Sequence, residues 1–270
     1  MRYVVALLLL ASLPLRAQED VPEVARSLME DAQRAHESGR DDDAIAKYTR
    51  AIEVAPALAS AYANLGAIYF ARGKVDDAYR TFTHGIENAP ADKTLLFNAA
   101  AAAQQLGKSA EGLRFVDKAL EATKNDPSLY ALRSTILRSL QRTGEALAAQ
   151  QQAVQLAPND AKLQFSLGNL LFQAGRKEDA IVAYRRAVDL DRTYMRAWYN
   201  LGAALFESGK YDDALQAYRV ALQPIDQAFA RNEKVDPIHA PAYANLGAIY
   251  LSQKQYAQAA DAYQKALRLD

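Results

Sequence analysis

The sequence predicts an all-α protein built from about seven consecutive copies of one two-helix unit. Segments 62–69 and 243–250 are identical, and segment 198–202 is closely similar to both. Aligning them gives a repeat of 34 residues, inside which apolar residues recur at the 3.6-residue spacing of an α-helix. Six units run without a gap over residues 25–228, and a seventh covers residues 240–270 after an insertion at 229–239. The units begin at Ala25, Ala59, Lys93, Pro127, Ala161, Met195 and Ala240.

Turn signals divide each unit into two helices. Glycine stands at repeat position 15, counted from the start of the unit, in five of the seven units. Glycine readily adopts the left-handed conformation that often ends a helix, so this position predicts the end of the first helix. Acidic residues such as Asp42 and Asp212 follow in the first turn of the second helix, where they face the positive end of the helix dipole.

Small residues mark the places where neighbouring helices are expected to touch. Repeat positions 8, 20 and 27 hold only Ala, Gly or Ser in all seven units, as Gly66, Gly168 and Gly202 illustrate. Large residues, mostly aromatic, occupy most of positions 4 and 24, as Tyr62 and Tyr184 do. Small residues beside large ones predict densely packed helix pairs.

These motifs resemble the tetratricopeptide repeat, and the resemblance extends from residue 25 to residue 270. It implies a right-handed solenoid of helix-turn-helix repeats in which the first helix of each repeat lines a concave groove. Since each repeat contacts only its neighbours, that groove would be an extended binding surface. The polar residues Arg133, Gln150 and Gln164 depart from the family pattern at one junction. Either long side chains reach solvent there, or the solenoid has a weaker seam.

Carrying the groove positions of the family onto this chain predicts a surface with aromatic, amide and cationic side chains. The aromatic residues would anchor a partner, the asparagines would grip a peptide backbone, and the cations would meet a carboxylate. The alternative is that individual phenylalanines belong to the core and that asparagine is simply common at position 6. The candidate groove residues are Asn64, Phe70, Phe97, Asn98, Arg138, Lys162, Phe165, Asn169, Phe172, Arg196, Tyr199, Asn200, Phe206 and Asn245.

Composition argues against several classes of function. The 270 residues include no cysteine, which excludes disulfides and thiolate metal sites. The 32 basic and 32 acidic residues balance, so the cationic bias of nucleic-acid binders is absent. The three histidines are too far apart in sequence for a helical metal pair. We therefore expect no enzymatic activity, no catalytic residues, no metal and no cofactor.

The first seventeen residues are predicted to be a signal peptide. A basic residue, a short apolar run and Pro14 precede Leu15-Arg16-Ala17, where a signal peptidase would cut. A retained anchor helix is the competing interpretation. Residues 18–24 would form a short lead before the first repeat. The expected product is an exported protein, periplasmic or secreted, with no integral membrane segment after signal removal.

The predicted function is that of an exported scaffold or adaptor that binds a peptide or protein segment in its groove. Similar exported repeat proteins assist pilus assembly, polysaccharide export and outer-envelope assembly. The alternative is a regulatory or substrate-binding part of a larger enzyme such as a glycosyltransferase. The last helix, from about Tyr256 to Leu269, is as apolar as internal ones. We therefore expect its open face to be covered by a second copy, in an end-to-end homodimer through the C-terminal repeat, or else by a partner or by downstream sequence.

Overall fold

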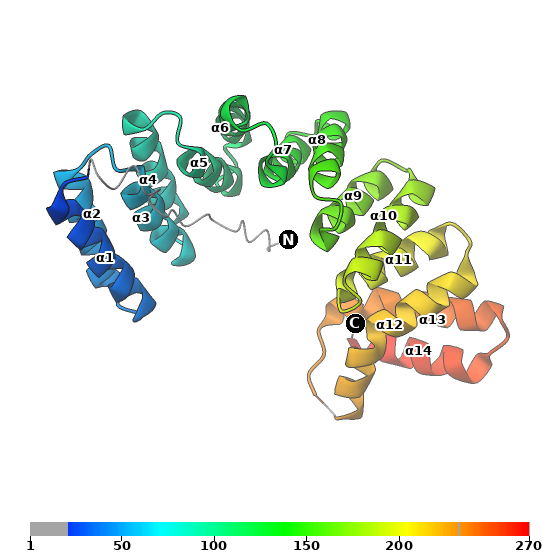
Figure 1. The fold of residues 1–270 in the computed structure, drawn as a ribbon. Coiled ribbons are helices and arrows are strands. Elements are labelled where there is room, and N and C mark those ends of the chain that lie inside the picture. The colour runs from blue at the N-terminus through cyan, green and yellow to red at the C-terminus, as the bar shows by residue number, and fades with distance from the viewer. Residues whose placement is uncertain (1–20, 232, 270) are drawn as a thin grey trace. The chain divides into compact units, whose positions relative to one another are not determined.

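The computed structural model describes residues 21–231 and 233–269, and this part of the chain folds into fourteen α-helices and a 3₁₀ turn without any strand. The predicted signal peptide lies outside these residues. The all-α helical-repeat fold is thereby confirmed. In order the helices are α1 (Glu23–Glu37), α2 (Asp41–Val54), α3 (Ala59–Ala71), α4 (Val75–Asn88), α5 (Lys93–Gln105), α6 (Ser109–Ala122), α7 (Pro127–Ser139), α8 (Thr143–Leu156), α9 (Ala161–Gln173), α10 (Lys177–Leu190), α11 (Met195–Glu207), α12 (Tyr211–Ala230), η2 (Pro237–His239), α13 (Ala240–Ser252) and α14 (Tyr256–Leu269) (Figure 1).

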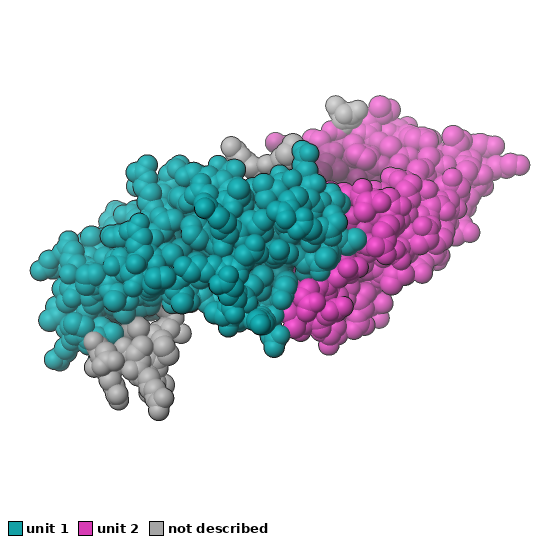
Figure 2. Space-filling model, turned by 90° about the horizontal axis from the view of Figure 1, so that it is seen from above, with its two compact units in different colours: residues 1–149 teal, residues 150–270 magenta. Residues whose placement is uncertain are grey.

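The chain divides into two compact units, one up to Ala149 and one from Gln150, coloured separately in Figure 2. Inside each unit the two helices of a repeat pack on each other, and each second helix packs on the first helix of the following repeat. The first helices also pack on one another, as α3, α5 and α7 in the first unit and α9, α11 and α13 in the second. Residues at equal repeat positions therefore line up along a row of first helices.

The turns inside the repeats have the backbone that the glycines predicted. Gly39, Gly73, Gly107, Gly175 and Gly209 have φ values between 72° and 76°. The two repeats without glycine at position 15 adopt the same turn, with φ of 60° at Gln141 and 61° at Lys254. This conformation is unfavourable for Gln141 and Lys254, because their Cβ atoms crowd the backbone in it.

The small residues lie where the helices approach most closely, as predicted. A Cβ atom on Gly168 would lie 2.6 Å from the ring of Tyr184, and one on Gly202 would lie 2.9 Å from the ring of Tyr218. Gly66 and Gly247 make the same approach to Phe82 and Tyr263, so in these four repeats position 8 packs against the aromatic ring at position 24. At Gly112, at position 20, the nearest neighbour of a Cβ atom would be the backbone oxygen of Ala100 at 3.1 Å.

The polar residues of the fourth and fifth repeats are held by hydrogen bonds. Gln150 is 2% exposed and donates to the carbonyl oxygen of Leu163 at 3.0 Å, and Gln164 donates to that of Pro158 at 3.2 Å. Both glutamines are buried, so the interpretation that their side chains reach solvent is wrong. Arg133 is half-buried and reaches the carboxylate of Asp117 at 2.7 Å. The weaker seam stays a prediction.

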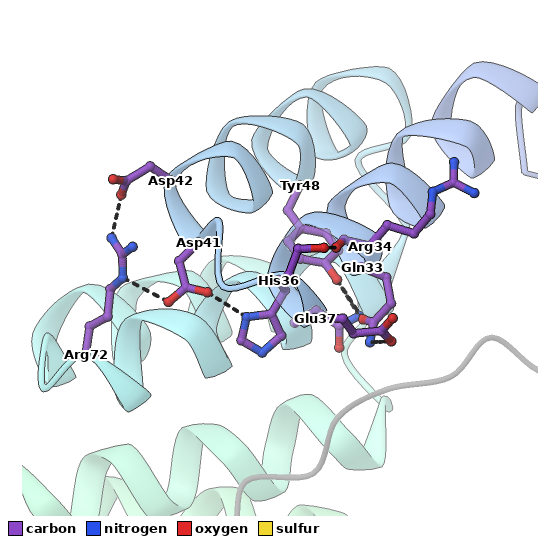
Figure 3. A network of polar contacts seen from close by, with 10 residues as sticks. Gln33, Arg34, His36, Glu37, Asp41, Asp42, Tyr48 and Arg72 are labelled. Atoms are coloured by element: carbon purple, nitrogen blue, oxygen red, sulfur yellow. Dashed lines mark hydrogen bonds and ion pairs between the residues drawn. The ribbon is translucent and has the colours of Figure 1, made fainter.

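Polar contacts connect the end of a first helix to the start of the preceding second helix. Arg72 follows α3 and binds Asp41 at 3.3 Å and Asp42 at 2.6 Å, both in the first turn of α2 (Figure 3). Asp41 also contacts Nδ1 of His36 at 2.7 Å. Gln253 makes the equivalent contact with Asp212 at 2.7 Å in the second unit. These contacts join neighbouring repeats at their turns.

The insertion before the last repeat is helical only at its start. α12 continues through Pro224 and ends at Ala230, six residues beyond the length of a second helix such as α10. The following residues are irregular up to η2, because Pro237 and the charged residues before it do not favour a helix.

Candidate partner-binding surface

The second unit carries most of the predicted groove residues on three adjacent first helices. Lys162, Phe165, Asn169 and Phe172 lie on α9, a second group lies on α11, and Asn245 lies on α13. Because these helices pack side by side, the side chains share one row. The group on α11 consists of Arg196, Tyr199, Asn200 and Phe206.

The four aromatic rings of this row are half-buried, so each is partly core and partly accessible. Phe165 packs between the rings of Tyr184 and Tyr194, with ring centroids 6.0 Å and 4.9 Å away. Tyr199 packs edge-on against Tyr218 at 6.1 Å. Phe206 packs against Tyr211 at 5.5 Å, and Phe172 completes the row from α9. The rings are therefore fixed on their inner sides while their outer sides remain accessible.

The asparagines of this row are tied to buried tyrosine hydroxyl groups. Oδ1 of Asn169 accepts hydrogen bonds from the hydroxyl of Tyr184 at 2.8 Å and from Nδ2 of Asn200 at 2.7 Å. Nδ2 of Asn245 donates to the hydroxyl of Tyr218 at 2.9 Å. Burial raises the pKa of Tyr184, and it raises the pKa of Tyr218 to about 12, so both hydroxyls stay protonated at neutral pH. The sequence pattern did not reveal these tyrosine partners.

The Asn169–Asn200 pair keeps one donor and one acceptor available. Among the described residues, Nδ2 of Asn169 and Oδ1 of Asn200 have no hydrogen-bond partner. A peptide unit of an extended chain offers the matching acceptor and donor. The pair therefore has the chemistry to hold a peptide backbone.

Two cations stand at the start of the same helices. Lys162 and Arg196, at repeat position 2 of α9 and α11, are exposed and form no ion pair with any residue that the structure describes. Exposed cations that form no ion pair can attract an anionic group of a partner.

The first unit presents the remaining candidate residues differently. Asn64 is 7% exposed, Phe97 is 8% exposed and Asn98 is fully buried. These three side chains are enclosed in this structure, so the expectation that they line an open groove is not met. Phe70 is half-buried against a cluster that includes Tyr79 and Phe82. Arg138, on α7, is exposed.

The described residues offer no metal centre, since no group of three or more His, Asp or Glu side chains among them could hold an ion. None of the described helices is both long enough and apolar enough to cross a membrane.

Paired helices with small residues at their contacts and an accessible row of side chains define a helical-repeat protein. A family model described as "TPR repeat" matches residues 32–73 and 168–209. Models described as "Tetratricopeptide repeat" match residues 196–223 and 240–270, and residues 127–160. The chain belongs to the tetratricopeptide-repeat family, and this assignment supports a role as a scaffold for contacts between proteins.

Solved structures share the fold. A tetratricopeptide repeat protein from Parabacteroides merdae is 18% identical with a TM-score of 0.64, over 92% of this chain and 94% of that one. PilF from Pseudomonas aeruginosa is 19% identical with a TM-score of 0.64, over 78% and 91%. YrrB, described as a TPR protein with an unusual peptide-binding site, is 23% identical with a TM-score of 0.54, over 65% and 91%. A comparison with curated proteins finds no match.

Proposed function

We propose that this protein is a non-enzymatic scaffold that holds an extended segment of another protein along α9, α11 and α13. The observation that carries the proposal is the row of half-buried aromatic rings with an accessible amide pair and two exposed cations on the same helices. The partner segment would carry bulky apolar side chains and at least one carboxylate. The rings supply an anchoring apolar surface, and the amide pair supplies contacts that do not depend on the sequence of the partner.

We also propose that the protein is exported, from its N-terminal sequence pattern alone. A basic start, an apolar run and a small residue before the expected cut are typical of a signal peptide. The protein would then be periplasmic or secreted and would act in assembly of the envelope or of a secretion complex.

We further propose that two copies associate end to end through the seventh repeat. The 75% exposure of Leu267 supports this association.

Capture of partners from an envelope extract tests the proposal. Proteins bound to the purified chain would be compared with those bound to the double variant Lys162→Glu/Arg196→Glu and identified by mass spectrometry. We expect the variant to lose the partner, and we expect binding by the original chain to weaken as salt increases, because exposed charges are screened.

A matched control has the same change in charge on another helix. Arg114→Glu/Lys118→Glu alters two exposed cations of α6, outside the row, that form no ion pair with any residue the structure describes. Binding should survive that change. Equal loss of partner in both variants, or binding that does not respond to salt, would remove Lys162 and Arg196 from the site.

A further inference from the structure

An apolar groove opens at the last repeat of the second unit. It has a volume of about 730 Å³ and lies between α11, η2, α13 and α14. Its walls include Tyr199, Ile238, Tyr263 and Leu267, and alanines such as Ala244 and Ala266 line it between them. No charged side chain lines the groove, so it suits an apolar occupant.

Part of this groove is a stacking surface that is covered in the other repeats of the unit. Leu267 on α14 is 75% exposed, whereas the residues at the same repeat position, Leu222 and Val188, are 1% and 2% exposed. Tyr263 is half-buried, whereas its counterpart Tyr218 is fully buried. In those repeats the next first helix packs against the second helix. A helical, apolar surface would therefore fit against α14.

The insertion supplies the other wall of the groove and is held in place. The Asp236 carboxylate accepts a hydrogen bond from the backbone N–H of Ile238 at 3.0 Å. The extension of α12 is fixed by Asp226, which accepts hydrogen bonds from Tyr243 at 2.9 Å and from Lys265 at 2.8 Å. Ile238 remains 68% exposed at the groove. The insertion thus adds an exposed apolar residue to the stacking surface.

The first helix of the chain is a poor occupant for this groove. At repeat positions 3, 7 and 10, where α3 has the buried residues Ala61, Leu65 and Ile68, α1 has Ser27, Asp31 and Arg34. Asp31 pairs with Arg34 at 2.5 Å and with Lys47 at 3.6 Å. Stacking α1 on α14 would bury these charges against apolar side chains, which carries a large desolvation cost.

We infer that the groove receives the same surface of a second copy, tail to tail. This rests on the proposed end-to-end association and specifies its geometry: a two-fold contact in which α14 and Ile238 of each copy cover the other. Such a contact is self-complementary and closes at two subunits. The contact is confined to the last repeat of each copy. We therefore expect a weak dimer, with a dissociation constant of about micromolar order.

Analytical ultracentrifugation of the purified chain over micromolar concentrations tests the inference. We expect a monomer–dimer equilibrium without larger species. Leu267→Lys and Ile238→Lys should each raise the dissociation constant at least about tenfold. Val182→Lys is the matched control, because Val182 is 67% exposed on α10, away from the groove. Circular dichroism would verify that each variant is folded.

The outcomes separate this geometry from the proposed function. A monomer at every concentration would overturn the association itself, and growth beyond dimers would point to head-to-tail stacking instead. If Leu267→Lys breaks the dimer but Ile238→Lys does not, association survives and the role of the insertion fails. An equal effect of Val182→Lys would contradict the assigned surface. A monomer that binds a different protein through Leu267 would make that protein the occupant. None of these results depends on capture of a partner by α9 and α11.

Discussion

At the residue scale, Gln141 and Lys254 stand at repeat position 15, in the turn between the two helices of a repeat. The other five repeats have glycine at this position. Gln141 and Lys254 both have a positive φ, a conformation that costs a residue with a Cβ atom about 1–2 kcal/mol. We therefore expect Gln141→Gly to raise the free energy of unfolding by up to about 1 kcal/mol, since glycine also gains freedom in the unfolded chain. Chemical denaturation measures this directly. A loss of stability would mean that the side chain of Gln141 makes a contact worth more than the strain.

Asp41 makes the stability of the first repeats depend on pH. The hydrogen bond with His36, aided by Arg72, lowers the pKa of Asp41 below its usual value of 3.8. A lowered folded-state pKa contributes stability above the unfolded-state pKa, and that stability is lost as pH falls through the folded-state value. Asp41→Asn should therefore be less stable at neutral pH, and its melting temperature should decline less below about pH 4.

Asp43→Asn is the control for this prediction. Asp43 lies in the same turn, but its ion pair is a local one with Arg40. Surface pairs of that kind contribute little. Equal melting curves for Asp41→Asn and the unchanged chain from neutral to acid pH would show that the contacts of Asp41 add nothing.

Single residues also show where sequence reasoning reaches its limit. Asparagine at position 6 of several units, with Asn169 at position 9 of the fifth, predicted a row of amide side chains, but the pattern carried no information about their partners. Asn169 is tied to Tyr184, fifteen residues later, and to Asn200, thirty-one residues later. Such contacts depend on how neighbouring repeats pack, and the sequence periodicity alone does not predict which side chains meet there.

At the scale of helices, the glycines at position 8 set the distance between paired helices. A methyl group on Gly202 would lie 2.9 Å from the ring of Tyr218, closer than real contacts allow. Gly202→Ala should therefore lower the free energy of unfolding by about 1–3 kcal/mol. Gly144→Ala is the opposite case, because nothing lies within 4 Å of a Cβ atom there. That variant should be neutral or up to about 1 kcal/mol more stable. Equal changes in the free energy of unfolding for the two variants would show that Gly202 does not set the distance between the paired helices.

The extended end of α12 is expected to stabilise the last repeat. Phe229 packs edge-on against Tyr243 with ring centroids 5.9 Å apart, and Arg268 lies over its ring at 4.9 Å. Phe229→Ala should lower the free energy of unfolding by about 1–2 kcal/mol, part of the cost for a fully buried ring. Gln227→Ala, an exposed position of the same helix, should have no effect. If Phe229→Ala also leaves the free energy of unfolding unchanged, the extension of α12 does not stabilise the last repeat.

At the scale of the whole molecule, the fold could be predicted because one pattern is repeated seven times. Small residues at three fixed positions constrain every unit in the same way, glycine marks the turn in five of the seven, and the last helix begins and ends as expected. The break in the 34-residue repeat also gave the length of the insertion, but it did not predict the structure of the insertion. It occurs once, so no second copy supports an interpretation, and α12 continues through Pro224 because its end packs on α13 and α14.

The candidate surface could be predicted only in part. Equal repeat positions have different surroundings in the two units. Asn98 is fully buried, whereas Asn200, at the same position, is half-exposed. Repeat position therefore indicates which face a residue occupies, and the surrounding residues decide whether a partner can reach it.

The central claim is that the aromatic row of α9 and α11 binds a partner protein, and the double variant Phe172→Ala/Phe206→Ala tests it most directly. Both rings are half-buried, so their removal should cost affinity while leaving most of the helix content. The measurement is the affinity for the captured partner, with circular dichroism as the check on folding. We expect a loss of at least about a hundredfold, as for the removal of two anchoring residues. An unchanged affinity in a folded variant would contradict the claim and assign these rings to the core.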